Sequence, residues 1–346
     1  MSQPSPWWDK ARHADRRRAL IARANVKAAL RGWFEDRGFV EVECGALAAS
    51  PGNEAHLHAF ETELVGPGGE TRPVYLHTSP EFAAKKLLAA GESRIFEFAR
   101  VFRNRERGAL HVPEFTMLEW YRANQAYDAV IEDTPALMRL AAETTGIGQF
   151  SFRERSCDPF AEAERLTVAE AFRKYADIDL LAALRRDGEG DRAVLASQAA
   201  RAGIAVVEDD RWSDIFSKIL VAKIEPELGN GRPTVLCEYP RCEAALARAA
   251  PHDARVAERF ELYVCGVELA NGFGELTDAG EQRRRFIAEM DEKERVYGGR
   301  YPLDEDFLAA LSQMPPACGV ALGFDRLAML AAGARTIDDV IWTPAP

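Results

Sequence analysis

The sequence predicts an α+β fold in which a mainly antiparallel sheet is flanked by helices. Strand-like segments occur in pairs joined by turn residues, as in 94–121 and 259–276, and such pairs form antiparallel hairpins. Helical segments lie around these pairs without the regular strand–helix–strand alternation of a parallel sheet. With 346 residues, 47% of them hydrophobic, we expect a flexible leader over 1–13 and a single domain over 14–346.

The first part of the domain predicts one long helix and the strands that follow it. Residues 14–37 are rich in helix formers, and Gly38 supplies a C-terminal stop. The segment 39–44 alternates apolar and acidic residues, which is typical of a half-buried strand. A loop and further strands then lead to Ser79-Pro80-Glu81, where Pro80 suits the first turn of a helix.

The segment 101–121 predicts a hairpin with a long polar loop. Its first arm ends in Arg103 and Arg105, and its second arm reads EFTMLEWY. Gly108 and Pro113 in the connecting segment are turn signals. Cations at the base of this hairpin could hold an anion, and carboxylates on the returning arm could hold a cation.

The rest of the chain predicts helices, then strands, then helices again. A helix over 127–146 precedes an intervening, mostly helical segment over 151–230. Strands resume in 233–240 and 259–276, and a charged helix covers 278–298. The chain closes with GVALGFDRLAMLAAG, a glycine-rich turn that feeds a helix.

Composition excludes several classes of protein. The net charge of -11 argues against a general nucleic-acid binder, because non-specific affinity comes from lysine and arginine contacts to phosphates. Six cysteines are scattered without metal-type spacing, which predicts reduced cytosolic thiols. No run approaches about 20 apolar residues, and the N-terminus lacks the apolar stretch of a signal peptide. We therefore expect a cytoplasmic protein with no membrane segment.

The segment VELANGFGEL contains two candidate ligands for a cation. Glu268 and Glu275 are seven residues apart, so a regular strand would place them on opposite faces. A bend at Asn271-Gly272 would bring both carboxylates to one pocket, where a divalent metal or an ammonium group would lie between them. The ordinary alternative is a charged hairpin edge.

Other candidates also have ordinary interpretations when they are taken singly. Arg103 could be a solvated cation, and Glu81 could be a first-turn acid favoured by the helix dipole. Arg326 follows Gly323 at a helix start, where anions are favoured, but the segment matches neither common nucleotide-binding fingerprint. His111 differs from the other histidines because it lies in the hairpin loop.

Taken together, these motifs resemble the catalytic core of class II aminoacyl-tRNA synthetases, specifically the lysyl branch. FVEVECGALAASPGNEAHLHAFET is similar to the first motif of that family, FRNRERGALHVPEFTMLEWY to the second and GVALGFDRL to the third. VELANGFGELTD is similar to the lysyl-specific segment between the last two. The resemblance covers about 14–343 and implies a homodimeric, ATP-dependent ligase that works through an aminoacyl-adenylate.

A lysyl synthetase also carries an N-terminal anticodon-binding domain, for which we expect no room before residue 14. The shorter core resembles paralogues that activate (R)-β-lysine and pass it to a lysine side chain of elongation factor P, so tRNA is not an expected partner. Ala321 replaces the usual glycine, and overpacking by about 1–3 kcal/mol would favour the β isomer. A truncated synthetase that charges tRNA and a non-catalytic sensor of amino acid or nucleotide stay open as alternatives.

The resemblance implies roles for individual residues. Arg103 would grip the α-phosphate and the substrate carboxylate, Phe115 would stack under adenine, and Arg326 would cover adenine and reach the γ-phosphate. The rest of the ATP and magnesium site would comprise Asn104, Arg105, His111, Val112, Glu268, Leu269 and Gly323. The site for the substrate amines would comprise Ser79, Pro80, Glu81, Glu119, Tyr121, Asn271, Glu275 and Ala321. Glu268 and Glu275 are the expected metal ligands.

Three positions depart from the pattern of the family. Arg105 stands where glutamate is usual, and Val112 stands where asparagine is usual. Both lie in the ATP loop, so the geometry around adenine is expected to differ. Gly45 replaces the usual proline of the first motif, which changes the expected shape of the dimer interface.

Overall fold

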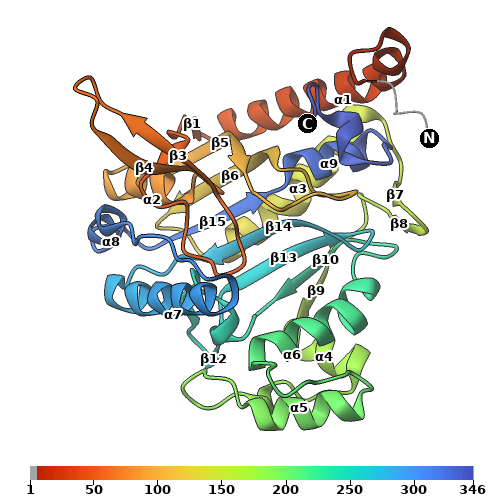
Figure 1. The fold of residues 1–346 in the computed structure, drawn as a ribbon. Coiled ribbons are helices and arrows are strands. Elements are labelled where there is room, and N and C mark those ends of the chain that lie inside the picture. Colours follow the sequence, from red (N-terminus) through yellow and green to blue (C-terminus); the bar gives the residue numbers. More distant parts are fainter. Residues whose placement is uncertain (1–5, 346) are drawn as a thin grey trace.

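The computed structural model describes residues 6–345 and has the expected α+β architecture (Figure 1). Its main sheet has eight strands. In spatial order they are β1 (Val40–Glu41), β5 (Arg94–Phe102), β6 (Glu114–Ala123), β15 (Ala317–Leu322), β14 (Val267–Gly274), β13 (Arg259–Val264), β10 (Thr234–Cys237) and β9 (Glu164–Thr167). Only the edge pairs β1–β5 and β9–β10 are parallel within this sheet. The prediction of a mainly antiparallel sheet is confirmed.

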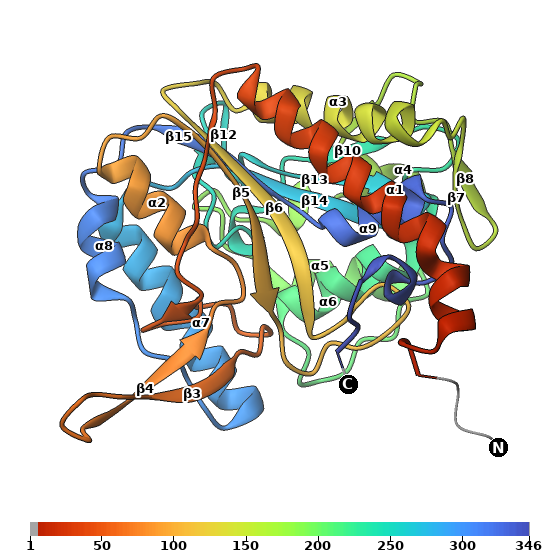
Figure 2. The ribbon, with the colours of Figure 1, turned by 90° about the horizontal axis from the view of Figure 1, so that it is seen from above.

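One face of the sheet is covered by α1 (Lys10–Glu35), α3 (Asp128–Thr145) and α9 (Phe324–Ala331) (Figures 1 and 2). These helices bury an apolar core against the central strands. Phe34 of α1 lies 4.6 Å from the Phe96 ring and 5.6 Å from the Trp120 ring, centroid to centroid. This large core holds the central strands β5, β6 and β15 rigidly.

The opposite face is covered only in part. Helices α2 (Glu81–Ala89), α7 (Ala279–Tyr297) and α8 (Glu305–Leu311) pack at one end, where the Phe82 and Phe307 rings stack at 4.1 Å. A small sheet of β2 (Leu47–Ala48), β4 (Thr71–Leu76) and β3 (Phe60–Val65) adjoins them, and its β3–β4 hairpin projects from the molecule (Figure 2).

The segment 151–230 forms a mostly helical unit at the β9 edge of the sheet (Figure 1). Helices α4 (Val168–Ala176), α5 (Arg192–Arg201) and α6 (Trp212–Ile219) share a core in which the Phe172 and Phe216 rings stack at 5.1 Å. The remaining strands are β7 (Phe150–Phe152), β8 (Arg155–Cys157), β11 (Ala249–Ala250) and β12 (Asp253–Ala257). Short 3₁₀ helices lie at Leu181–Ala183, Glu225–Glu227, Arg241–Glu243 and Ile337–Val340, and a short π-helix lies at Leu220–Ile224.

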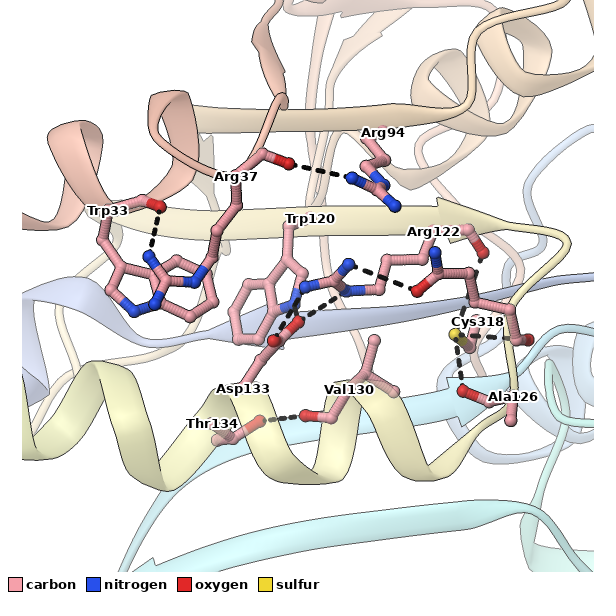
Figure 3. A network of polar contacts seen from close by, with 11 residues as sticks. Trp33, Arg37, Arg94, Trp120, Arg122, Ala126, Val130, Asp133, Thr134 and Cys318 are labelled. Carbon is pink, nitrogen blue, oxygen red and sulfur yellow. Dashed lines mark hydrogen bonds and ion pairs between the residues drawn. The ribbon is translucent and has the colours of Figure 1, made fainter.

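A buried ion pair joins β6 to α3 behind the sheet (Figure 3). Arg122 donates from Nε and Nη2 to the two carboxylate oxygens of Asp133, at 2.8 and 2.9 Å. Trp120 Nε1 also donates to Asp133, at 3.1 Å, and the Arg122 guanidinium lies 4.6 Å from the Phe39 ring. A bidentate pair with these extra partners satisfies both charges away from water.

Three elements differ from the sequence-based expectations. Helix α1 begins at Lys10, inside the expected leader, because Asp9 caps it by accepting from the backbone N–H groups of Ala11 and Arg12; residues 1–5 of that leader lie outside the described residues. The strand expected over 39–44 is only two residues long. GVAL is strand β15 rather than a turn, so the turn before α9 is confined to Gly323.

The structure also shows the state of the cysteines and the character of the helices. All six cysteines are free thiols, and four of them are buried. Within residues 6–345, no helix combines the length and the apolar character that crossing a membrane requires.

Candidate active site

The partly covered face of the sheet carries a cavity of about 900 Å³, including its open mouth. Its walls come from β6, β14 and β15, from the loop between β5 and β6, and from the first turns of α2 and α9. The predicted site residues that line it are Ser79, Glu81, Arg103, His111, Val112, Phe115, Glu268, Leu269, Asn271, Ala321, Gly323 and Arg326. Segments far apart in the sequence therefore meet at one site.

The two predicted catalytic arginines both border this cavity. Arg103 Nε donates to the carbonyl oxygen of Thr78 at 3.2 Å, and its guanidinium carbon lies 5.5 Å from the Phe115 ring centroid. Arg326 donates to the carbonyl oxygens of Leu110 at 3.2 Å and Glu268 at 2.8 Å. Backbone carbonyl groups thus hold both guanidinium groups at the border of one cavity.

His111 connects the loop between β5 and β6 to the start of α9. Arg326 Nη2 lies 2.8 Å from His111 Nε2. Burial and the positive charge of Arg326 lower the pKa of His111. A neutral imidazole nitrogen accepts the hydrogen bond from the guanidinium, so the pair is stable at neutral pH.

Asp325 anchors the start of α9, a role that the sequence reasoning missed. Its carboxylate is fully buried and accepts from Arg23 Nη2 of α1 and from the Thr116 backbone N–H of β6, each at 2.7 Å. The second and third motifs are thereby tied to each other and to α1. The only signal in the sequence was the place of Asp325 beside Arg326 in GFDR.

The bend expected at Asn271-Gly272 is wrong, because β14 runs through both residues as a strand. Ala270 pairs with Leu262, and Glu268 pairs with Tyr263, so Leu269 is an extra residue that forms a bulge. One extra residue shifts the alternation of side chains by one position. The bulge, rather than a bend, brings Glu268, Asn271 and Glu275 to the same face of the sheet.

Glu261 is a second residue that the sequence reasoning missed. It pairs with Asn271 across the β13–β14 hairpin and therefore faces the same side as Glu268. Tyr239 OH and Tyr263 OH both donate to its Oε2 at 2.6 Å, and Arg259 Nη2 donates to its Oε1 at 2.6 Å. Burial, followed by the charge of Glu261, raises the pKa of Glu268. Two neighbouring carboxylates of this kind can hold a divalent cation.

A buried group of acids extends below the cavity from Ser79. Ser79 Oγ donates to Glu119 Oε1 at 2.5 Å, and Tyr121 OH donates to Glu119 Oε2 at 2.7 Å. Glu119 is 2% exposed. Burial raises the pKa of Glu119 to about 8, and the nearby charge of Glu81 adds to the rise.

Lys85 lies inside this group and was also missed. Its side chain is 1% exposed, and Nζ lies 2.5 Å from Glu81 and 2.6 Å from Glu275. Burial opposes the charge on Lys85, but the two carboxylates overcome this and raise the pKa of Lys85. We call Glu81, Lys85, Glu119, Tyr121 and Glu275 the amine pocket.

Strand β15 passes beside the amine pocket. Gly319 pairs with Tyr121, and a Cβ atom at residue 319 would lie 2.4 Å from the Tyr121 ring and 2.6 Å from Glu275 Oε1. Only glycine can approach so closely. Ala321 pairs with Glu119 on one side and with Asn271 on the other, so its methyl group lies between the amine pocket and the cavity.

Some predicted site residues do not line the cavity. They are Pro80, Asn104, Arg105, Glu119, Tyr121 and Glu275. Arg105 is exposed, has a left-handed φ of 65° and places its guanidinium carbon 5.8 Å from the Tyr297 ring centroid. Glu106 lines the cavity in its place. Glu275, one of the two expected metal ligands, is paired with Lys85.

The antiparallel sheet and the converging motif arginines define a class II synthetase core. The chain belongs to the family described as tRNA synthetases class II (D, K and N). The model of this family matches residues 5–345 of the chain. It is 41% identical to the elongation factor P--(R)-beta-lysine ligase of Klebsiella pneumoniae subsp. pneumoniae, over 99% of this chain and 98% of that protein. Proteins of the same name from Pectobacterium atrosepticum (42%) and Erwinia tasmaniensis (41%) match over the same shares. The predictions of the fold and of an ATP-dependent ligase are confirmed.

Proposed function

We propose that this protein uses ATP to activate (R)-β-lysine as an acyl-adenylate and transfers the acyl group to a lysine side chain of elongation factor P. The observation that carries the proposal is the amine pocket beside the cavity of Arg103 and Arg326, in which two carboxylates pair with Lys85 and a third acid, Glu119, lies near Glu81. Relatives named for this reaction and similar over nearly their whole length support it.

The arginines would stabilise the first step. The carboxylate of β-lysine attacks the α-phosphate of ATP, and pyrophosphate leaves. Such a transfer needs positioning and neutralisation of charge rather than a protein nucleophile. Arg103 would bind the α-phosphate and the substrate carboxylate, Phe115 would stack with adenine, and Arg326 would reach the γ-phosphate. His111 holds Arg326 in place for this role.

Magnesium would lie at Glu261 and Glu268. The two carboxylates belong to adjacent strands, and burial followed by the charge of Glu261 raises the pKa of Glu268. Carboxylate oxygens are the ligands that a hard divalent cation prefers. Glu275 is paired with Lys85 and Glu261 with Arg259, each at 2.6 Å, so Glu268 is the carboxylate that has no cation at short distance among the described residues. When bound, the metal supplies charge neutralisation between the phosphates. Glu261 and Glu268 would be the residues of this chain that hold it.

The amine pocket would bind the two ammonium groups of the substrate. When Glu81, Glu119, Glu275 and Lys85 are all ionised, the amine pocket has a net charge of minus two. This charge matches a diamine that carries two ammonium groups. Ser79 and Tyr121 orient the Glu119 carboxylate. The Ala321 methyl group narrows the floor between this pocket and the cavity, and we infer that it favours the β isomer over α-lysine.

We also propose a cytoplasmic homodimer. Val40 of β1 and Leu47 of β2 are each 54% exposed, and both lie in the segment that resembles the first motif of the family. Exposed apolar side chains on short edge strands are suited to pairing with a second copy. A mass measured in solution that equals one chain would contradict this.

The test is a measurement of the intact mass of elongation factor P after incubation with this protein, ATP and (R)-β-lysine. We expect a gain of one lysyl unit at one lysine. ATP–pyrophosphate exchange measured with α-lysine and β-lysine in parallel reports the first step alone. Charging of bulk tRNA would support a truncated synthetase instead, and no exchange with any amine substrate would support a sensor.

A further inference from the structure

Glu54 lies where three cavities meet. It borders the site cavity, a second cavity of about 900 Å³ beside α2, and a third of about 1600 Å³ between α7 and the helical segment. In the site cavity it shares the lining with Arg103, Ser79 and Glu81. Glu54 follows strand β2 in a loop, and the neighbouring residue Ala55 is held by a hydrogen bond from its N–H to Glu289 Oε2 at 2.9 Å.

The third cavity joins the site to the protein surface. Its inner end shares Asn271 and Phe273 with the site cavity, and its outer end is lined by Glu189 and Arg211, which are exposed. Carboxylates outnumber cations along it. The acids are Glu54, Glu189, Asp214, Glu243, Glu289 and Glu292, and the cations are Arg211 and Arg259. A lysine side chain entering by this route would meet Glu54 at the junction with the site cavity.

The Glu54 side chain is exposed to solvent, although protein surrounds it where the three cavities meet. Burial raises the pKa of Glu54, Arg103 opposes the rise, Glu81 and Glu289 add to it, and Arg259 opposes it. These four groups belong to four different elements, and Lys293 of α7 also interacts with Glu54.

Three of the other acids near this junction already have partners. Glu81 is paired with Lys85, and Glu119 accepts from Ser79 and Tyr121. Glu289 accepts from the Ala55 N–H. The acceptor lysine arrives as an ammonium ion, which cannot attack a carbonyl until it loses a proton. A base is therefore needed where the third cavity meets the site cavity, and Glu54 lines both.

We propose that Glu54 is the general base of the acyl-transfer step, and this inference rests on the proposed function. The Glu54 carboxylate takes one proton from the acceptor ammonium group. The neutral amine then forms the new C–N bond with the acyl carbon, and the C–O bond to AMP breaks. The second proton leaves with the phosphate oxygen of AMP, so the products are the amide, AMP and protonated Glu54.

The test separates the two steps in the full-length protein. The variant is Glu54→Gln, which keeps the size of the side chain and removes the base. Glu292→Gln is the matched control, because it makes the same change in the same cavity away from Arg103. ATP–pyrophosphate exchange with (R)-β-lysine reports activation. Single-turnover transfer from the preformed adenylate to elongation factor P reports the second step.

We expect Glu54→Gln to slow transfer by about 10²- to 10⁴-fold, the usual contribution of a general base, and by at least tenfold more than it slows exchange. Raising the pH should restore the variant, because the acceptor lysine then loses its proton to water. Hydroxylamine, a nucleophile that is neutral at pH 7, should trap the adenylate equally well in both proteins.

Three outcomes would overturn the inference. Transfer in Glu54→Gln within threefold of the unchanged protein would remove Glu54 as the base. Equal losses in Glu54→Gln and Glu292→Gln would show a general effect of charge in the cavity. A loss of transfer that is the same at every pH would show a structural role. Absence of exchange with (R)-β-lysine in the unchanged protein would instead refute the proposed function itself.

Discussion

Strand β6 carries two buried groups of charges, one on each face, and they differ in their balance. Glu119 and Tyr121 face the amine pocket, whereas Trp120 and Arg122 face α3, because side chains alternate along a strand. Behind the sheet, one guanidinium meets one carboxylate with two hydrogen bonds (Figure 3). In the amine pocket, the Lys85 ammonium group pairs with Glu81 and Glu275, and Glu119 adds a third acid near Glu81.

This difference distinguishes a structural ion pair from a binding site. The pair of Arg122 and Asp133 satisfies itself, so it needs nothing from outside the protein. In the amine pocket, which has more carboxyl groups than cations, burial and then the charge of Glu81 raise the pKa of Glu119 to about 8. Burial of unbalanced charge is costly, and a cationic ligand would relieve the cost. A buried ion pair with balanced charges therefore indicates a structural role, whereas a buried group with more carboxylates than cations indicates a binding site.

The largest effect is expected from removing half of the balanced pair. Asp133→Ala leaves Arg122 buried and unpaired, which should lower the free energy of unfolding by about 3–5 kcal/mol. Urea denaturation measures this loss. The control is Asp128→Ala on the same helix, whose exposed pair with Arg165 should contribute no more than about 1 kcal/mol. Similar losses in the two variants would contradict the distinction.

Removal of a cation that binds substrate should lower activity strongly and stability only slightly. Arg326→Ala should lower kcat/KM for ATP–pyrophosphate exchange by about 10²- to 10³-fold, the usual result of removing one group that stabilises developing charge. The unfolding midpoint should move much less than in Asp133→Ala, since Arg326 is not paired to a buried carboxylate at short distance. If exchange falls by less than threefold, Arg326 does not contact the nucleotide.

The excess charge should appear in the pH dependence of stability. The folded protein holds a proton on Glu119 up to pH about 8, whereas the unfolded chain releases it near pH 4.5. Between these values the folded state binds more protons, so this carboxyl makes stability fall as pH rises, by at most about 1.4 kcal/mol per pH unit. Glu119→Gln should remove that contribution. An unchanged slope between pH 5 and 8 would show that the group is not buried as described.

The smallest effect is expected at Ala321, between the amine pocket and the cavity. Ala321→Gly removes one methyl group without changing charge, so the shift in preference from β-lysine toward α-lysine should be about 1 kcal/mol, or roughly fivefold. The ratio of exchange rates with the two isomers measures it. A preference that does not move, with both rates intact, would place the selection of the isomer elsewhere in the amine pocket.

Much of the fold followed from local patterns in the sequence. The hairpin of β5 and β6 was predicted from two strand-like arms around Gly108 and Pro113, and the structure has it. The helix after Pro80 was also predicted correctly. The errors fell where local patterns conflict: GVAL was interpreted as a turn because of its glycine, although Gly319 is needed inside a strand to make room for Tyr121.

The sequence by itself determined which chemical groups are present and the order in which they occur along the chain. It supplied the motif arginines, the acids of EFTMLEWY and ELANGFGEL, and an alternation that separates Glu119 from Trp120. Only the tertiary structure decided which groups meet. The bulge at Leu269, the position of Lys85 between Glu81 and Glu275, and the junction at Glu54 depend on contacts between segments distant in the chain. No local pattern specifies such contacts, because they arise when strands pair and helices pack.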